Sequence, residues 1–147
     1  MSLVATQEVT DTIGYLIVQL CKLYRNATAE KLAPLGLHPG QEMMLCEISQ
    51  SGGGLTQGEL AEMLAVQPAT VSKMLSRMDA AGLISGCRDV NDGRITRLHL
   101  TEAGVRAHDE IEVVWGDLER QTLANFTIEE RVLLRRLLMQ VIANLGG

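Results

Sequence analysis

Aromatic residues are scarce in this sequence: Phe, Trp and Tyr together make up 3% of its 147 residues. Hydrophobic residues nevertheless make up 46%. The core must therefore be built from aliphatic side chains and methionine, which favours helices packed on helices over a β-sandwich. Charged residues make up 21%, as in ordinary globular chains, which argues against intrinsic disorder. The length predicts one domain, residues 1–147.

Cysteine is also scarce, and its pattern argues against a metal or a disulfide framework. Cys21, Cys46 and Cys87 form no Cys-x-x-Cys pair and have no nearby His to complete a zinc site. We therefore expect reduced thiols, no cofactor and no metal. No apolar run is long enough to span a bilayer, and signal-peptide flanks are lacking. These features predict a cytoplasmic protein without a membrane partner.

Cations are fewer than anions, with 13 Lys and Arg against 18 Asp and Glu, which gives a net charge of −5. This balance excludes a protein that coats nucleic acid over its whole surface. Segment 67–97, in contrast, has a net charge of +2, so a local nucleic-acid-binding surface remains possible. Its cations are Lys73, Arg77, Arg88, Arg94 and Arg97, and its carboxylates are Asp79, Asp89 and Asp92.

Hydrophobic periodicity predicts a mainly helical chain with two short strands. Helices are expected over roughly 8–32, 40–50, 57–64, 68–81, 102–124 and 128–144, and strands over 83–87 and 95–100 with a polar hairpin tip between them. The long terminal helices carry more apolar surface than the small central region can cover, which indicates a dimer interface.

Local signals mark where several of these helices begin. Capping boxes are predicted at Thr56 and Thr127, Thr101 is expected to cap the fifth helix, and Gln67 can cap the helix that starts at Pro68. The glycines at 52–54 end the second helix. They do not form a phosphate-binding loop, because no Gly-Lys-Ser/Thr follows them.

Residues 57–81 meet the steric requirements of a helix-turn-helix. The small Ala61 stands where the two helices cross, and Ala65 occupies the turn position that needs a positive φ. The outer face of the second helix is poor in carboxylates and carries hydroxyls and cations, the groups that reach phosphates and base edges. The candidate DNA-contacting residues here are Gln67, Ala69, Thr70, Ser72, Lys73, Ser76 and Arg77.

Four motifs, in their order and spacing, resemble the MarR (multiple-antibiotic-resistance regulator) family of winged helix-turn-helix proteins. They are PATVS at 68–72, AGLI at 81–84, DGR at 92–94 and LTEAG at 100–104. The resemblance covers essentially the whole chain. It implies a winged helix-turn-helix over 40–101, with the helix-turn-helix at 57–81 and the wing at 84–100. It also implies that helices 8–32 and 102–144 interlock in a homodimer.

The resemblance further implies that Arg94 enters the DNA minor groove and that Asp92 braces the wing. Arg88 and Arg97 complete the candidate DNA-contacting set. A hairpin-tip Arg suits a narrow minor groove, where the potential is most negative. The predicted function is a sequence-specific DNA-binding regulator. We expect a repressor that binds a semi-palindromic operator as a homodimer and responds to a small aromatic or phenolic effector.

Two alternative functions remain open. The first is an oxidant-sensing regulator that uses Cys21, although this cysteine lies several residues further along its helix than the reactive cysteine of such proteins. The second is a protein-interaction module without DNA binding, against which the cations Lys73, Arg77 and Arg94 argue. An enzyme is not expected, because no Gly-x-Ser-x-Gly, His-Glu-x-x-His or nucleotide-binding motif is present.

Overall fold

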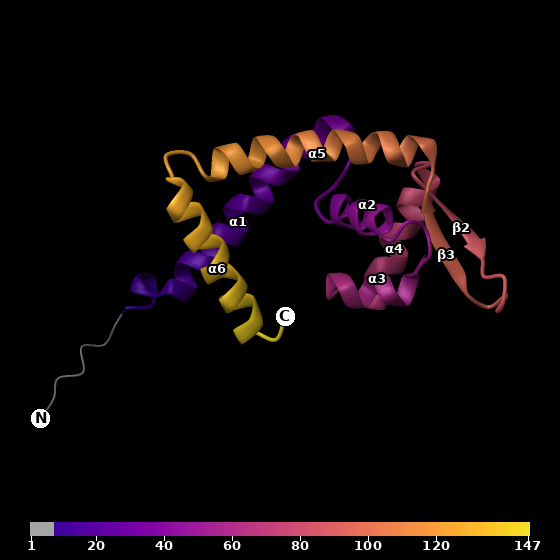
Figure 1. Cartoon of the computed structure of the whole chain (residues 1–147), viewed down its shortest axis with the longest axis horizontal. Helices are drawn as coiled ribbons and strands as arrows, with labels where there is room; N and C mark the ends of the chain where they lie inside the picture. Colours follow the sequence, from indigo (N-terminus) through magenta and orange to yellow (C-terminus); the bar gives the residue numbers. More distant parts are fainter. Residues whose placement is uncertain (1–7) are drawn as a thin grey trace, which may run out of the picture. The chain divides into compact units, whose positions relative to one another are not determined.

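The computed structural model of the chain describes residues 8–147 (Figure 1). It is mainly helical with one small antiparallel sheet, which confirms the predicted fold class. The elements are η1 (Val9–Asp11), α1 (Ile13–Leu32), η2 (Ala33–Leu35), α2 (Gln41–Gln50), β1 (Leu55–Thr56), α3 (Gln57–Leu64), α4 (Pro68–Ala80), β2 (Ile84–Arg88), β3 (Thr96–Leu100), α5 (Glu102–Thr122) and α6 (Ile128–Asn144).

The chain divides into two compact units. The first ends at Val114 and the second runs from Trp115 to Gly147. Helix α5 crosses this boundary without a break, so it contributes residues to both units. Across residues 8–147, no helix combines the length and the hydropathy needed to span a bilayer.

The first predicted helix, 8–32, is interrupted near its start. Thr12 is extended, with φ −85° and ψ 150°, and separates η1 from α1. Its Oγ1 donates a 2.7 Å hydrogen bond to the Val9 carbonyl and accepts one from the Tyr15 N–H at 3.1 Å. Threonine hydroxyls compete in this way with backbone hydrogen bonds. The long helix therefore begins at Ile13, and the predicted start at residue 8 was wrong.

The core of the first unit is aliphatic, as the scarcity of aromatic residues predicts. Helices α1, α2, α3, α4 and the first half of α5 all contribute side chains that are almost completely shielded from solvent. Burying each such side chain stabilises the fold by about 1.5–3 kcal/mol relative to leaving it exposed. The most deeply buried members are Leu32, Met44, Leu45, Ile48, Leu60, Val71, Met78 and Ile111.

The helix-turn-helix forms at the predicted place. Thr56 and Glu59 make both bonds of the capping box, at 3.2 and 2.9 Å, and fix the start of α3. Ala61 is buried where α3 faces the core. Ala65 adopts the left-handed conformation, with φ 51° and ψ 42°, which confirms the turn predicted there. This conformation costs a non-glycine residue about 1 kcal/mol.

The sheet has the order β1–β3–β2, with both pairs antiparallel. Strand β1 was not predicted. It pairs Leu55 with Leu98 and Thr56 with Arg97. A two-residue strand shows no alternation that a sequence pattern could reveal. Because β1 leads directly into α3, it joins the base of the β2–β3 hairpin to the helix-turn-helix.

Helix α5 begins tightly against the end of the helix-turn-helix. Thr101 Oγ1 donates a 2.5 Å hydrogen bond to the Gly82 carbonyl and accepts one from the Gly104 N–H at 3.0 Å. A Cβ atom at position 104 would lie 2.0 Å from the Leu83 carbonyl oxygen. Only glycine fits this contact, which gives the LTEAG motif a structural reason.

The second unit consists of the end of α5 and the helix α6. Thr127 and Glu130 form the predicted capping box, at 3.2 and 2.9 Å. Arg131 also donates a 3.2 Å hydrogen bond to the Leu123 carbonyl. None of the 17 residues of α6 is buried. The start of α6 is therefore fixed by local hydrogen bonds, and its apolar side chains are not buried by any part of residues 8–147.

Candidate nucleic-acid interface

Helix α4 has a buried face and an opposite polar face. Val71, Leu75 and Met78 lie against the core at helical spacing, which orients the helix. The polar face is then turned to solvent. Every α4 residue predicted to contact DNA is exposed, together with the residue that precedes the helix: Gln67, Ala69, Thr70, Ser72, Lys73, Ser76 and Arg77.

The start of α4 differs in one respect from the prediction. Gln67 occupies the N-cap position, but its side chain makes no capping hydrogen bond. Instead its backbone carbonyl accepts from the N–H groups of Thr70 and Val71, at 3.0 and 3.1 Å. The prediction that the Gln67 side chain caps this helix was wrong. Gln67 is exposed at the start of α4.

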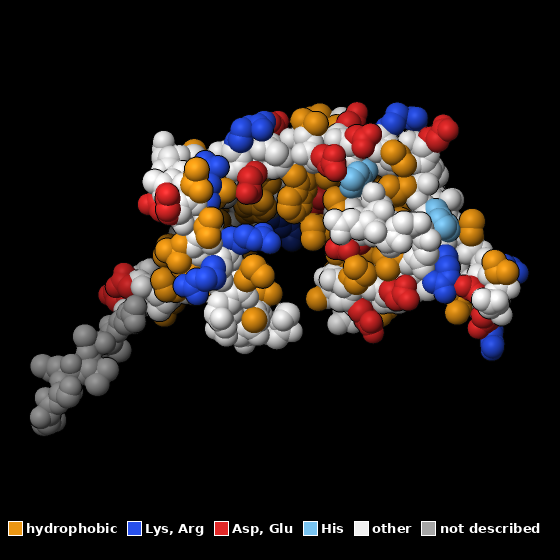
Figure 2. Space-filling model, in the orientation of Figure 1, with side chains coloured by type: hydrophobic (Ala, Val, Ile, Leu, Met, Phe, Trp, Pro, Cys, Tyr) orange, Lys and Arg blue, Asp and Glu red, His pale blue; other side chains and the backbone are white. Residues whose placement is uncertain are grey.

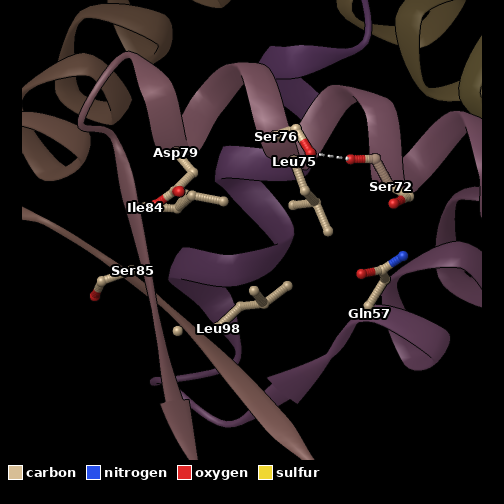
Figure 3. A pocket seen from close by; sticks show the side chains of 9 residues that line it. Gln57, Ser72, Leu75, Ser76, Asp79, Ile84, Ser85 and Leu98 are labelled. Atoms are coloured by element: carbon tan, nitrogen blue, oxygen red, sulfur yellow. Dashed lines mark hydrogen bonds between the residues drawn. The ribbon is translucent and has the colours of Figure 1, made fainter.

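A shallow hollow of about 250 Å³ lies beside α4, between this helix and the sheet (Figure 3). Its apolar lining includes Leu75 and Leu98, and Ser76 donates a 3.0 Å hydrogen bond to the Ser72 carbonyl along its helical side. Gln57 from α3 and Ser85 from β2 also line it. Sequence reasoning did not single out these two exposed polar residues, because a helix start and a short strand explained them.

The hairpin formed by β2 and β3 carries exposed cations. Arg88 ends β2 and is exposed, and the Arg94 side chain in the loop is 93% exposed. Figure 2 shows Lys and Arg side chains in blue over the region of the β2–β3 hairpin. Asp92 Oδ1 accepts from the Arg94 backbone N–H at 3.0 Å and from its Nε at 3.3 Å. Asp92 is thus hydrogen-bonded to Arg94, and its role in bracing the wing stays a prediction.

Arg97 is arranged differently from the other predicted cations. It is half-buried, and its Nε donates to Asp89 Oδ2 at 2.5 Å while its Nη1 donates to the Gly54 carbonyl at 2.6 Å. The sequence predicted no role for Asp89 beyond its negative charge. In the structure its carboxylate accepts hydrogen bonds from Arg97 and from two backbone N–H groups of the hairpin loop. The hydrogen bond from Arg97 lowers the pKa of the Asp89 carboxyl below its usual value, and the loop N–H bonds lower it further. An Asp that opens a hairpin loop is the signal that could have identified it.

Metal binding finds no support in the described residues. Across positions 8–147, no three His, Cys, Asp or Glu side chains lie close enough together to hold an ion. Cys21, Cys46 and Cys87 are free thiols.

The first unit carries the polar face of α4 next to the cationic β2–β3 hairpin. This arrangement is chemically suited to a polyanion.

Comparisons with known proteins agree with this geometry. The model of the MarR family matches residues 35–95. An HTH-type transcriptional repressor of Mycobacterium tuberculosis is 29% identical over 126 residues, which cover 86% of this chain and 90% of that protein. The multiple antibiotic resistance protein MarR of Escherichia coli is 29% identical over 131 residues, which cover 88% and 90%.

Solved structures give the same result. A cysteine-to-serine mutant of Escherichia coli MarR, crystallised with operator DNA, superposes with a TM-score of 0.81 at 27% identity, over 91% of this chain and 98% of that one. The MepR–DNA complex of S. aureus superposes with a TM-score of 0.84 over 95% and 100%, and its 21% identity supports the fold alone.

Proposed function

Because the chain belongs to the MarR family of winged-helix, DNA-binding transcriptional regulators, we propose that it is a cytoplasmic homodimer that represses transcription from a semi-palindromic operator. Proteins of this family are regulators and not enzymes. The observation that carries the proposal is the placement, on one unit, of the exposed polar face of α4 and of the exposed Arg94 on the hairpin.

In the proposed complex, α4 enters the major groove and the β2–β3 hairpin, the wing, enters the adjacent minor groove. Thr70 and Lys73 lie in the first turns of α4, from which a recognition helix reaches base edges. Arg94 meets the strong negative potential of the minor groove. Arg77 and Arg88 contact phosphates and add affinity without sequence preference.

The proposed homodimer is supported by apolar side chains of α1 and α6 that the described residues, 8–147, leave exposed. In α1, Thr28 and Leu32 are the buried residues, and both belong to its last two turns. In α6 no residue is buried, and the apolar side chains of Leu133, Leu137 and Ile142 are 45–57% exposed. Exposed apolar surface of this extent is typical of interfaces. Two-fold symmetry would place two copies of α4 about 34 Å apart, one turn of DNA.

Regulation by a small aromatic or phenolic effector is the last part of the proposal. Such a compound releases DNA only if it binds the DNA-free arrangement of the dimer more tightly than the DNA-bound one. The ratio of its affinities for these two arrangements sets how far the equilibrium between them moves.

Selection from a pool of random DNA duplexes with the purified chain tests the proposed function. Two inverted half-sites about one helical turn apart are expected, together with a dimer in sedimentation equilibrium. Repeating the selected complex with a panel of phenolic and aromatic acids tests release. A Thr70→Ala variant should change the selected sequence, whereas Glu129→Ala, at the start of α6, should leave it unchanged. Failure to enrich any sequence would contradict the proposal.

A further inference from the structure

We propose that Arg97, Asp89 and the carbonyl of Gly54 form a wing strut, through which Arg97 aids DNA binding by positioning the hairpin loop instead of contacting phosphate. The inference rests on the proposed minor-groove contact of Arg94. It changes the role that the sequence predicts for Arg97. It also gives a role to two features that the proposed function leaves unused, the glycines at 52–54 and the carboxylate of Asp89.

At the loop end of the wing strut, one carboxylate organises the turn. Asp89 Oδ1 accepts from the N–H groups of Asn91 and Asp92, at 2.8 and 3.0 Å, while Oδ2 accepts from Arg97 Nε. The Asp89 side chain is only 13% exposed. Both carboxylate oxygens are therefore in use, and the charge of Arg97 is balanced within the protein.

At the other end, Arg97 reaches the loop that follows α2, 43 residues away along the chain. This loop lies directly against β3. A Cβ atom at Gly53 would lie 2.4 Å from Nδ1 of His99, and Gly53 also has a φ of +83°. Glycine therefore allows the loop to bring the Gly54 carbonyl within reach of Arg97. The glycine run thus supplies the acceptor at this end of the wing strut.

These hydrogen bonds form a continuous series that ends at the predicted minor-groove residue. Gly54 accepts from Arg97, Arg97 donates to Asp89, and Asp89 accepts from the N–H of Asp92. Asp92 in turn accepts from the backbone N–H and Nε of Arg94. The direction in which Arg94 leaves the loop is thus tied to the start of the helix-turn-helix. A loop that already has its DNA-bound conformation loses less conformational entropy on binding than a flexible one.

The wing strut predicts an effect of opposite sign to simple electrostatics. Asp89→Ala removes a negative charge from a hairpin that faces DNA, so charge alone would strengthen binding. Loss of the wing strut would weaken it. Arg97→Lys keeps the positive charge, so a phosphate contact would survive, but an ammonium group cannot reproduce the directed pair of bonds to Asp89 and Gly54. Asp79→Ala, which removes a carboxylate from the end of α4, is the matched control for charge alone.

The experiment compares major-groove and minor-groove protection of the selected operator by the full chain. Hydroxyl radicals report the minor groove, and dimethyl sulfate reports guanine N7 in the major groove. We expect Asp89→Ala and Arg97→Lys to bind about tenfold or more weakly, to lose hydroxyl-radical protection as Arg94→Ala does, and to keep dimethyl sulfate protection. Either change added to Arg94→Ala should cost little more. Asp79→Ala should bind as tightly as the parent or more tightly.

Several outcomes would overturn the inference, and they separate it from the proposed function. Tighter binding by Asp89→Ala, or parental binding by Arg97→Lys, overturns the wing strut. Loss of protection in both grooves with a lower Tm means that these residues serve folding and not positioning, which also overturns it. If Arg94→Ala loses minor-groove protection and Asp89→Ala does not, the wing strut fails and the proposed function stands. If Arg94→Ala keeps that protection, the proposed wing contact fails as well.

Discussion

Replacing Arg94 with Ala should reduce the salt dependence of operator binding by an amount that follows from the structure. The side chain is 93% exposed, and a dimer would present two of them. Each lost contact flattens the slope of log K against log salt by about 0.9, so the dimer loses about 1.8. Extrapolated from 1 M to about 0.1 M salt, this corresponds to about 60-fold weaker binding, or about 2.4 kcal/mol.

Fluorescence anisotropy with the selected operator, between about 50 and 300 mM salt, measures this slope. Arg120→Ala is the matched control, because it removes the same charge from an exposed Arg that pairs with Asp117 in α5 and not in the wing. Its slope should equal that of the parent chain. An unchanged slope for Arg94→Ala would refute the wing contact, and a change of about 0.9 would mean that one wing per dimer engages DNA.

The other predictions concern stability and assembly. Ala65→Gly should relieve the strain of the left-handed backbone at this position. After subtraction of the greater conformational entropy that glycine gives the unfolded chain, the free energy of unfolding should rise by about 0.5 kcal/mol, which urea unfolding would measure. Burial raises the pKa of the Glu42 carboxyl above its ordinary value, so its stabilising contribution is present below the unfolded pKa and is lost as pH rises through the folded pKa. Glu42→Gln should therefore unfold at a higher temperature than the parent at pH 7–8, and the difference should close toward pH 4; a constant difference would contradict this assignment. Leu137→Glu should raise the dimer dissociation constant at least about tenfold in sedimentation equilibrium without loss of helical circular dichroism, and an unchanged constant would exclude this face of α6 from the interface.

Sequence patterns predicted the elements that depend on local hydrogen bonds and on burial of one face. Both capping boxes, the left-handed Ala65 and the buried face of α4 are where the pattern placed them. Each depends on residues within one or two turns of each other, so periodicity and side-chain chemistry are sufficient to find it.

Features that depend on distant partners were missed or misassigned. Strand β1 exists because Leu55 and Thr56 meet β3, and no local pattern marks that pairing. Arg97 had the same appearance in the sequence as Arg94, yet its partners lie 8 and 43 residues away, so an exposed cation was expected where the structure has a half-buried one. The DNA contacts of the exposed α4 and hairpin residues stay predictions.

The start of α6 has a consequence for how two copies would associate. Its first turn is closed by the capping box at Thr127 and by the bond from Arg131 to Leu123, neither of which needs a partner. At its far end, Gln140 Nε2 donates a 2.9 Å hydrogen bond to Asn144 Oδ1, and the Gly147 N–H donates to the Ile142 carbonyl at 3.0 Å. Both ends of α6 are therefore closed by hydrogen bonds within one chain, so the helix should persist in a separated monomer. Association would then bring together helices that are already formed, so its entropy cost would lie mainly in ordering the exposed apolar side chains and not in forming α6.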